Sequence, residues 1–224
     1  MATHLVTGAG SGIGSVLAQR LLERGDEVLA LARSGERAQE LAADLPGASI
    51  QVADLAFPES IESLEIPEAL DSVVHAAGVV DLGPVSELSV EAWATQLRVN
   101  LVAPAALTRV VLPALRAARG TVVFVNSGAG LAAHPQWAAY AASKHGLRAL
   151  ADSLRAEESG TGVRVTSVYP GRTATPMQEK VHAQEGKDYD PESWIRPETV
   201  AEAILGVLDL GPDATVPDLS IRPR

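Results

Sequence analysis

Short apolar runs alternate with helical patterns along most of the chain. The runs are nearly continuous stretches of Val, Leu and Ile, which predict strands buried on both faces of a sheet. Apolar residues spaced three or four positions apart predict amphipathic helices between these runs. The predicted strands, the first with the glycines that it runs into, are residues 4–10, 27–33, 49–55, 72–78, 121–127, 163–171 and 214–221. The predicted helices are residues 15–25, 35–45, 90–118, 140–158 and 198–210, with a short helix between the third and fourth strands.

This order predicts a Rossmann-type, doubly wound α/β fold with about seven mainly parallel strands and helices on both faces, in one domain, 1–224. Ligands of such sheets gather at the carboxyl ends of the strands. Pro217 indicates that the last strand lies at an edge. Residues 177–197 are polar, with isolated Met, Tyr and Trp and no clear period. A connection of that length is often a lid, so we expect a substrate lid there.

Composition narrows the possible partners. The net charge of −10 argues against a surface for nucleic acid or anionic membranes. The chain has no cysteine, which excludes disulfides, thiolate nucleophiles and Cys-ligated metals. No apolar run reaches the length of a membrane span, and no basic region precedes the apolar start, so we expect a cytoplasmic protein. No His, Asp and Glu cluster has metal-ligand spacing, and we predict no metal.

The first strand ends in the glycine-rich segment "TGAGSGIG", residues 7–14, and a helix follows at once. Glycines at this junction let the backbone turn tightly and approach a pyrophosphate, whose charge is stabilised at the helix N-terminus. The alternative is a turn with an ordinary helix cap. The predicted cofactor contacts in this segment are Gly8, Ser11, Gly12, Ile13 and Gly14.

The end of the second strand indicates which dinucleotide is bound. An NAD site normally has an acidic residue there, whereas an Arg accommodates the 2′-phosphate of NADP. Here Ala32 is followed by Arg33 and Ser34, which favours NADP(H) over NAD(H). The alternative is that Arg33 is a solvated cation at a helix start. Asp54, after the third strand, is suited to accept from the adenine amino group or, alternatively, to cap a helix.

Tyr140 stands four positions before Lys144, one helical turn along the same face. With three tyrosines and three lysines in the chain, such a pair arises by chance about 4% of the time, so it needs support from other residues. An ammonium beside the phenol is expected to lower the pKa of Tyr140 by about two to three, which would suit it for proton transfer.

Taken together, these segments resemble the short-chain dehydrogenase/reductase family, in the one-domain branch with a T-G-x-x-x-G-x-G loop. The resemblance runs from Thr7 to about Leu208, and Ser127 precedes Tyr140 by the thirteen residues typical of the family. The matching segments are "TGAGSGIG", "ADL" with Asp54, "HAAG" at 75–78, "VNLVAP" with Asn100, "VNSGAG" with Ser127, "YAASK" and "YPGRTATPM" at 169–177.

The resemblance implies a catalytic role for four residues. Tyr140 would be the general acid or base, and Lys144 would assist it and bond the nicotinamide ribose. Ser127 would hydrogen-bond the substrate carbonyl. Asn100 would hold a water that links Lys144 to solvent, the alternative being a buried Asn that pairs with backbone.

The resemblance also implies further cofactor contacts, from the ends of the later strands. They are Leu55, Ala76, Gly78, Pro170, Gly171, Thr173 and Thr175, together with Tyr140 and Lys144. His75 stands where the family usually has Asn, so the support of the central strand must be made differently or be lost. The chain end lacks the family's usual glycine-ended tail, which favours a homodimer through the helices near 100–118 and 140–158 over a homotetramer.

The substrate pocket is the part that the sequence specifies least. We expect Ser127, His134 and Trp137 at its entrance and Met177 and Trp194 beside the lid. His134 and His182 are either polar substrate contacts or solvated surface histidines.

The leading function is an NADPH-dependent oxidoreductase that interconverts a small-molecule carbonyl and an alcohol. The first alternative is a non-catalytic NADP-binding sensor or scaffold, which could lose Tyr or Lys, whereas this chain keeps both. The second is a sugar-nucleotide epimerase or dehydratase, which usually needs more chain after Pro170 than the fifty-odd residues present.

Overall fold

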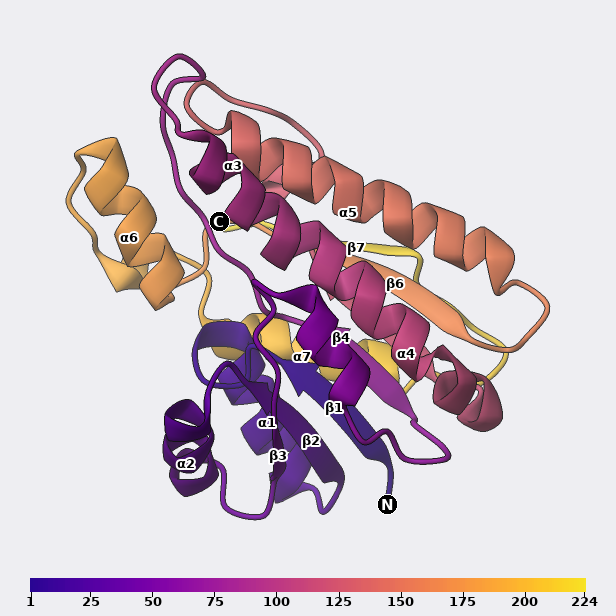
Figure 1. The fold of residues 1–224 in the computed structure, drawn as a ribbon. Helices are drawn as coiled ribbons and strands as arrows, with labels where there is room; N and C mark the ends of the chain where they lie inside the picture. The colour runs from indigo at the N-terminus through magenta and orange to yellow at the C-terminus, as the bar shows by residue number, and fades with distance from the viewer.

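The structure is a computed structural model that describes all residues, 1–224. Seven parallel strands form one sheet in the order β3-β2-β1-β4-β5-β6-β7 (Figure 1). The strands are β1 Thr3–Thr7, β2 Glu27–Ala32, β3 Ser49–Val52, β4 Ser72–His75, β5 Thr121–Val125, β6 Arg164–Pro170 and β7 Asp218–Ile221. The helices are α1 Gly12–Glu23, α2 Gly35–Asp44, α3 Val90–Leu97, α4 Ala103–Ala118, α5 Ala138–Glu157, α6 Pro176–Glu185 and α7 Pro197–Leu208. The predicted Rossmann-type fold is confirmed.

Alternate side chains of each strand enter two separate cores. Leu5 of β1 belongs to a core that also contains Phe124 and residues of α4 and α5. Its neighbour Val6 points to the opposite face and packs with residues of α1, α2 and α7. Figure 1 shows α4 and α5 running side by side over one face, with α7 behind the sheet. Both faces are therefore buried, as the continuous apolar runs require.

The strand order reverses direction between β1 and β4. From β1 the chain first builds outward through β2 and β3, and then returns to build β4 to β7 on the other side. The loops that follow β1 and β4 diverge there, which opens a crevice at the carboxyl ends of the two strands. β7 is an edge strand, as Pro217 predicted.

The predicted helix at 90–118 is present but is interrupted by a π turn at Arg98–Val102. This helical region is long and apolar enough to cross a membrane by length and composition. Its apolar side chains, however, repeat every four residues toward the sheet, at Ala103, Leu107, Val111 and Leu115. The region therefore serves this fold as a core helix.

Residues 177–197 contain a helix that we did not predict. Thr175 caps α6 by accepting a hydrogen bond from Gln178 N, and Pro176 occupies the first turn. Gly186 ends the helix with φ +66°. The capping signature "TPMQ" was visible in the sequence, but α6 lacks a regular apolar face, so periodicity alone did not reveal it.

His75 supports the central strand through a contact to a helix. Its Nε2 lies 3.0 Å from Thr108 Oγ1 of α4, and its ring stacks on Phe124 at 4.8 Å. Burial lowers the pKa of His75 to about 3, so the ring is neutral. The strand support expected from the usual Asn is thus made differently, by a neutral imidazole.

Candidate active site

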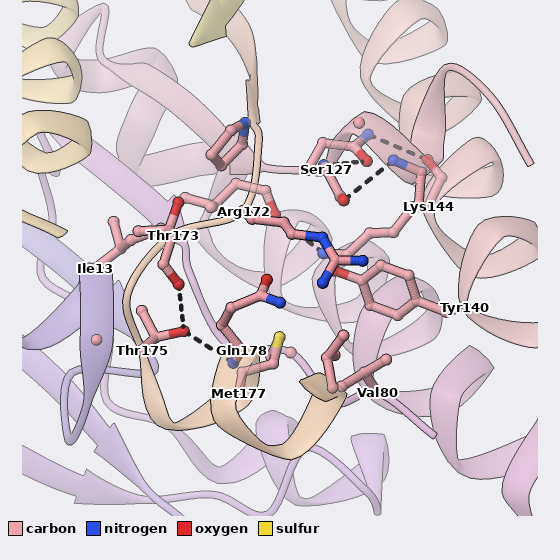
Figure 2. A pocket seen from close by; sticks show the side chains of 18 of the residues that line it. Ile13, Val80, Ser127, Tyr140, Lys144, Arg172, Thr173, Thr175, Met177 and Gln178 are labelled. Carbon is pink, nitrogen blue, oxygen red and sulfur yellow. Dashed lines mark hydrogen bonds between the residues drawn. The ribbon is translucent and has the colours of Figure 1, made fainter. Parts of the chain in front are cut away.

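A cleft of about 720 Å³ opens at the carboxyl ends of the strands. In Figure 2, Ile13, Thr173 and Thr175 lie at one end of the cleft and Ser127, Tyr140 and Lys144 at the other. Sixteen of the predicted site residues line it: Gly8, Ser11, Gly12, Ile13, Ala76, Gly78, Ser127, His134, Trp137, Tyr140, Lys144, Pro170, Gly171, Thr173, Thr175 and Met177. One concave site therefore joins the glycine-rich segment to the Tyr–Lys pair.

The glycine-rich segment forms a concave cradle, which stays open because its glycines have no side chains. Gly8 has φ +70°, and a Cβ placed on it would lie 2.7 Å from Ala77 N. Gly12 has φ +56° and faces the side chain of Thr175. The helix α1 begins here with no acidic residue in its first turn, and the Ser11 side chain makes no capping bond. Its first N–H groups are thus available to a phosphate, and the segment fits the pyrophosphate of a dinucleotide.

The residues predicted at the adenosine end lie outside the cleft lining. Arg33 is exposed and forms no ion pair, whereas Ser34 caps α2 by accepting from Arg37 N. The Arg37 guanidinium lies over the glycine-rich segment, 3.3 Å from where a Cβ on Gly10 would be. Arg37 is paired with Glu40, so of these two arginines only Arg33 is without an ion pair.

Three other predicted cofactor residues also lie outside the cleft lining. Asp54 Oδ1 accepts from Ala56 N at 2.9 Å in a local turn. The N-cap of the next helix, Pro58–Ser63, is Phe57, so Asp54 does not cap that helix, and its contact with the adenine stays a prediction. Leu55 packs against the core under α4. Gly14 lies at the start of α1, where a Cβ would lie 2.4 Å from Gly8 O, so its role is to let the helix approach the strand end.

Tyr140 and Lys144 are both buried, and burial moves their pKa values in opposite directions. It raises the pKa of Tyr140 to about 12, with the Ser127 hydroxyl acting against the rise. It lowers the pKa of Lys144 to about 8. The Lys144 ammonium donates to Val125 O at 3.0 Å and lies 5.8 Å from the centre of the Tyr140 ring. The predicted lowering of the Tyr140 pKa is therefore wrong for this structure, because desolvation outweighs an ammonium held at that distance.

Asn126 is a site residue that the sequence reasoning missed. Its side-chain oxygen accepts from Ser127 N at 2.9 Å, and its side-chain nitrogen donates to Lys144 O at 3.1 Å. It therefore fixes the end of β5 against α5 and sets the position of Ser127 relative to Lys144. The segment "VNSGAG" contained this residue, but only the contact across to α5 reveals its role.

Asn100 lies in the π turn, and its side chain is fully engaged. Its oxygen accepts from Val79 N at 2.8 Å, and its nitrogen donates to Val79 O and to Ser143 Oγ. The side chain thus pairs with backbone, which was the alternative reading. A water linking Asn100 to Lys144 stays a prediction.

One wall of the cleft comes from residues that the sequence reasoning did not single out. They are Val80 after β4, Arg172 after β6, and Gln178, Val181 and Glu185 of α6. Arg172 Nη2 lies 2.6 and 2.9 Å from the two carboxylate oxygens of Glu185. The available signal was a charged residue, Arg172, inside the strand-end segment "PGRTAT".

Trp194 and His182 are placed differently from our predictions. Trp194 does not line the cleft but lies behind Arg172, with 5.4 Å between its ring centre and the guanidinium carbon. His182 is 3% exposed, so it is not a surface histidine, and it packs against Trp194 at 5.2 Å. His182 of α6 and Trp194, which follows the short 3-10 helix Pro191–Ser193, support the α6 wall from behind because their rings pack against each other.

Comparisons with known proteins agree with this site. The sequence profile of the short chain dehydrogenase family matches residues 2–186. The chain is 30% identical over 241 residues to dehydrogenase/reductase SDR family member 11 of Gallus gallus, covering 98% of this chain and 94% of that protein.

Two solved structures share the fold closely. A serine dehydrogenase complexed with NADP+ superimposes with a TM-score of 0.86 at 29% identity, covering 98% of this chain and 94% of that one. A 4-hydroxyisoleucine dehydrogenase complexed with NADH superimposes with a TM-score of 0.84 at 27% identity, covering 100% and 98%. With its dinucleotide cradle and its Ser–Tyr–Lys set, this chain is an oxidoreductase that belongs to the short-chain dehydrogenase/reductase family.

Proposed function

We propose that this protein interconverts a small-molecule ketone or aldehyde and the corresponding alcohol, with NADP(H) as cofactor and Tyr140 as general acid or base. The observation that carries the proposal is the continuous cleft from the glycine cradle to a buried Tyr140, Lys144 and Ser127. The names of the two structural neighbours, dehydrogenases of serine and of 4-hydroxyisoleucine, denote oxidation of alcohols and support this reaction class.

The nicotinamide, when bound, supplies or accepts the hydride, and the chain's own residues handle the proton. Ser127 hydrogen-bonds the substrate oxygen and orients it in this proposal. Tyr140, with its pKa raised to about 12, is protonated at neutral pH and is ready to donate to the forming alkoxide. The Lys144 ammonium stabilises the phenolate that this donation leaves behind.

The first test is equilibrium binding of NADPH to the purified protein, followed by absorbance loss with a panel of aldehydes and ketones. We expect tight binding and turnover of at least part of the panel. Tight binding with no turnover of any carbonyl, and no reduction of NADP+ by any alcohol, would favour a non-catalytic sensor instead.

The preference for NADP(H) over NAD(H) forms a second part of the proposal. It is supported by the free Arg33 guanidinium and by the absence of a carboxylate at the end of β2. Arg33→Ala is expected to weaken NADPH binding about ten- to hundredfold and to leave NADH binding nearly unchanged, because only NADPH carries the 2′-phosphate. Arg98→Ala, which removes an exposed arginine of the π turn, is the matched control. Equal losses for both cofactors in Arg33→Ala would refute the phosphate contact.

We further propose that the protein is cytoplasmic and forms a homodimer, without a nucleic-acid or membrane partner. The dimer would pair the outer faces of α4 and α5, where Val102 is 46% exposed. A homotetramer is the alternative assembly.

A further inference from the structure

Arg172 is the one arginine whose side chain lines the cleft. It follows Gly171 at the end of β6, and Figure 2 shows its side chain extending into the cleft toward the side where Tyr140 lies. Its neighbours are all on the α6 side: Glu185, His182 and Trp194. Thr175, by contrast, faces Gly12 at the cradle. Arg172 therefore lies on the substrate side of the cleft, away from the pyrophosphate cradle.

The guanidinium is held firmly but is not saturated. Both short contacts to Glu185 come from a single nitrogen, Nη2. Nη1 lies 3.5 Å from His182 Nε2, which is long for a hydrogen bond, and Nε has no partner. Trp194 packs against the guanidinium and fixes its orientation. Since a guanidinium has five N–H donors, Arg172 can still bind a second anion from the cleft.

The charges around the cleft favour such an anion. Its lining has two cations, Lys144 and Arg172, and one carboxylate, Glu185. Glu185 is also paired with Lys187 at 3.1 Å, so it stays neutralised when the free donors of Arg172 bind a ligand. At the rim, Arg222 comes within 2.9 Å of the position of a Cβ on Gly128 and forms no ion pair. The protein as a whole carries −10, so this local excess of cations is specific to the cleft.

We propose that Arg172 binds a carboxylate of the substrate, which makes the substrate an oxo acid in one direction and a hydroxy acid in the other. Here Arg172 determines specificity, and Tyr140 remains the proton donor. This inference rests on the proposed carbonyl–alcohol function and names its substrate class.

The test compares each acid with its neutral ester. Reduction by NADPH is measured for 2-, 3- and 4-oxo acids of four to six carbons and for their methyl esters, which keep the carbonyl but lose the charge. The wild type is expected to favour at least one acid over its ester. Arg172→Met should lower kcat/KM for that acid about ten- to hundredfold, mainly through KM, and leave the ester within about twofold. Arg172→Lys keeps the positive charge but loses the planar guanidinium that can bind a carboxylate through two N–H groups. This variant should retain part of the preference for the acid over the ester.

Two further variants distinguish binding of the substrate carboxylate by Arg172 from a purely structural role of Arg172 in holding α6. Glu185→Gln removes the competing carboxylate and should lower KM for the acid. Lys187→Met removes the cation that neutralises Glu185 from outside the cleft, so it should raise KM for the acid and leave the ester unchanged. The dissociation constant of NADPH should stay the same in Arg172→Met. A rise in that constant, or equal losses on acid and ester, would assign Arg172 to the cofactor or to the fold and overturn the inference.

Binding to the NADP+-loaded protein gives a readout that does not need turnover. Calorimetric titration with the same acids and esters should show acid-selective binding that Arg172→Met abolishes. Selective binding without any turnover would support the carboxylate site while contradicting the proposed reaction. Turnover of esters and simple ketones with no acid preference would leave the reaction standing and sink the carboxylate site.

Discussion

Tyr140 and Lys144 determine the pH range in which the proposed reduction can run. Because burial brings the pKa of Lys144 down to about 8, the ammonium is lost just above neutral pH, whereas the phenol stays protonated to about pH 12. The proton donor is thus present throughout, and the charge that stabilises its conjugate base is the group that titrates.

We therefore predict that kcat/KM for carbonyl reduction is flat below pH 8 and falls about tenfold per pH unit above it. In Lys144→Met the rate should be lower and the break near pH 8 absent. Steady-state kinetics between pH 6 and 10 check this, with cofactor saturation verified at each pH. A break that persists in Lys144→Met would assign the titration to another group.

His75 is predicted to make folding stability pH-dependent. Its folded pKa of about 3 lies below the unfolded value of 6.5, so the unfolded chain binds the extra proton between these values. The stability contributed by neutral His75 is complete above pH 6.5 and decreases as the pH falls. Between pH 7.5 and 5.5 the loss is about 1.4 kcal/mol.

His75→Gln, which keeps a group near Thr108 but cannot titrate, should escape this loss. Urea unfolding at the two pH values measures the difference in free energy of unfolding between wild type and variant. This difference should shrink by about that amount from pH 7.5 to pH 5.5. If the difference in free energy of unfolding between wild type and His75→Gln does not change with pH, His75 is not a buried, neutral imidazole.

For single residues, the sequence predicted which residues form the site better than it predicted their pKa values. Ser127, Tyr140 and Lys144 were indicated by their spacing together with the other segments that resemble the family. The direction of the Tyr140 pKa could not be predicted, since it depends on how deeply packing buries the phenol. Arg172 and Asn126 were missed because their partners, Glu185 and Lys144, are far from them in sequence.

Among the elements, α6 has the contacts of a lid. Lys180 of α6 donates to Val80 O at 2.7 Å and pairs with Asp81 at 2.9 Å, and Gln184 Nε2 donates to the same carboxylate at 2.8 Å. These contacts tie the helix to the loop after β4 across the cleft. Movement of the 177–197 segment as a substrate lid stays a prediction.

Asp81→Ala is predicted to loosen α6 selectively. The Lys180–Asp81 pair is half exposed, so its loss should cost less than about 1 kcal/mol and raise amide exchange in residues 176–185 about two- to fivefold. Hydrogen exchange with mass spectrometry measures this, and Glu91→Ala, which breaks an exposed pair on α3, is the control. Unchanged amide exchange in α6, or increased exchange across the whole sheet, would show that the contacts with Asp81 do not hold α6 in place.

For the whole molecule, the order of apolar runs was sufficient to predict the fold, because a parallel sheet buried on both faces leaves few topologies open. The cleft wall formed by α6 was not predictable in the same way. Its helix is defined by caps at Thr175 and Gly186, and its position depends on contacts with Asp81 and Arg172 that no local pattern encodes.

The proposed dimer is a prediction about the whole molecule. Sedimentation at micromolar concentration should give twice the 23.3 kDa chain mass. Val102→Glu, which places a charge on the outer face at the start of α4, should shift the protein to monomer while the far-ultraviolet spectrum stays unchanged. A wild-type monomer would refute the dimer, and a mass four times that of the chain would favour the tetramer.

The role of Tyr140 as proton donor is best tested by the turnover of Tyr140→Phe, with NADPH binding measured on the same sample. The substitution removes only the phenol oxygen, so the dissociation constant of NADPH should stay within about twofold. Carbonyl reduction should fall by about 10²- to 10⁴-fold, the usual contribution of a general acid. Turnover that survives the loss of this oxygen would contradict the account, because no other buried proton donor stands beside Ser127 and Lys144 in the cleft.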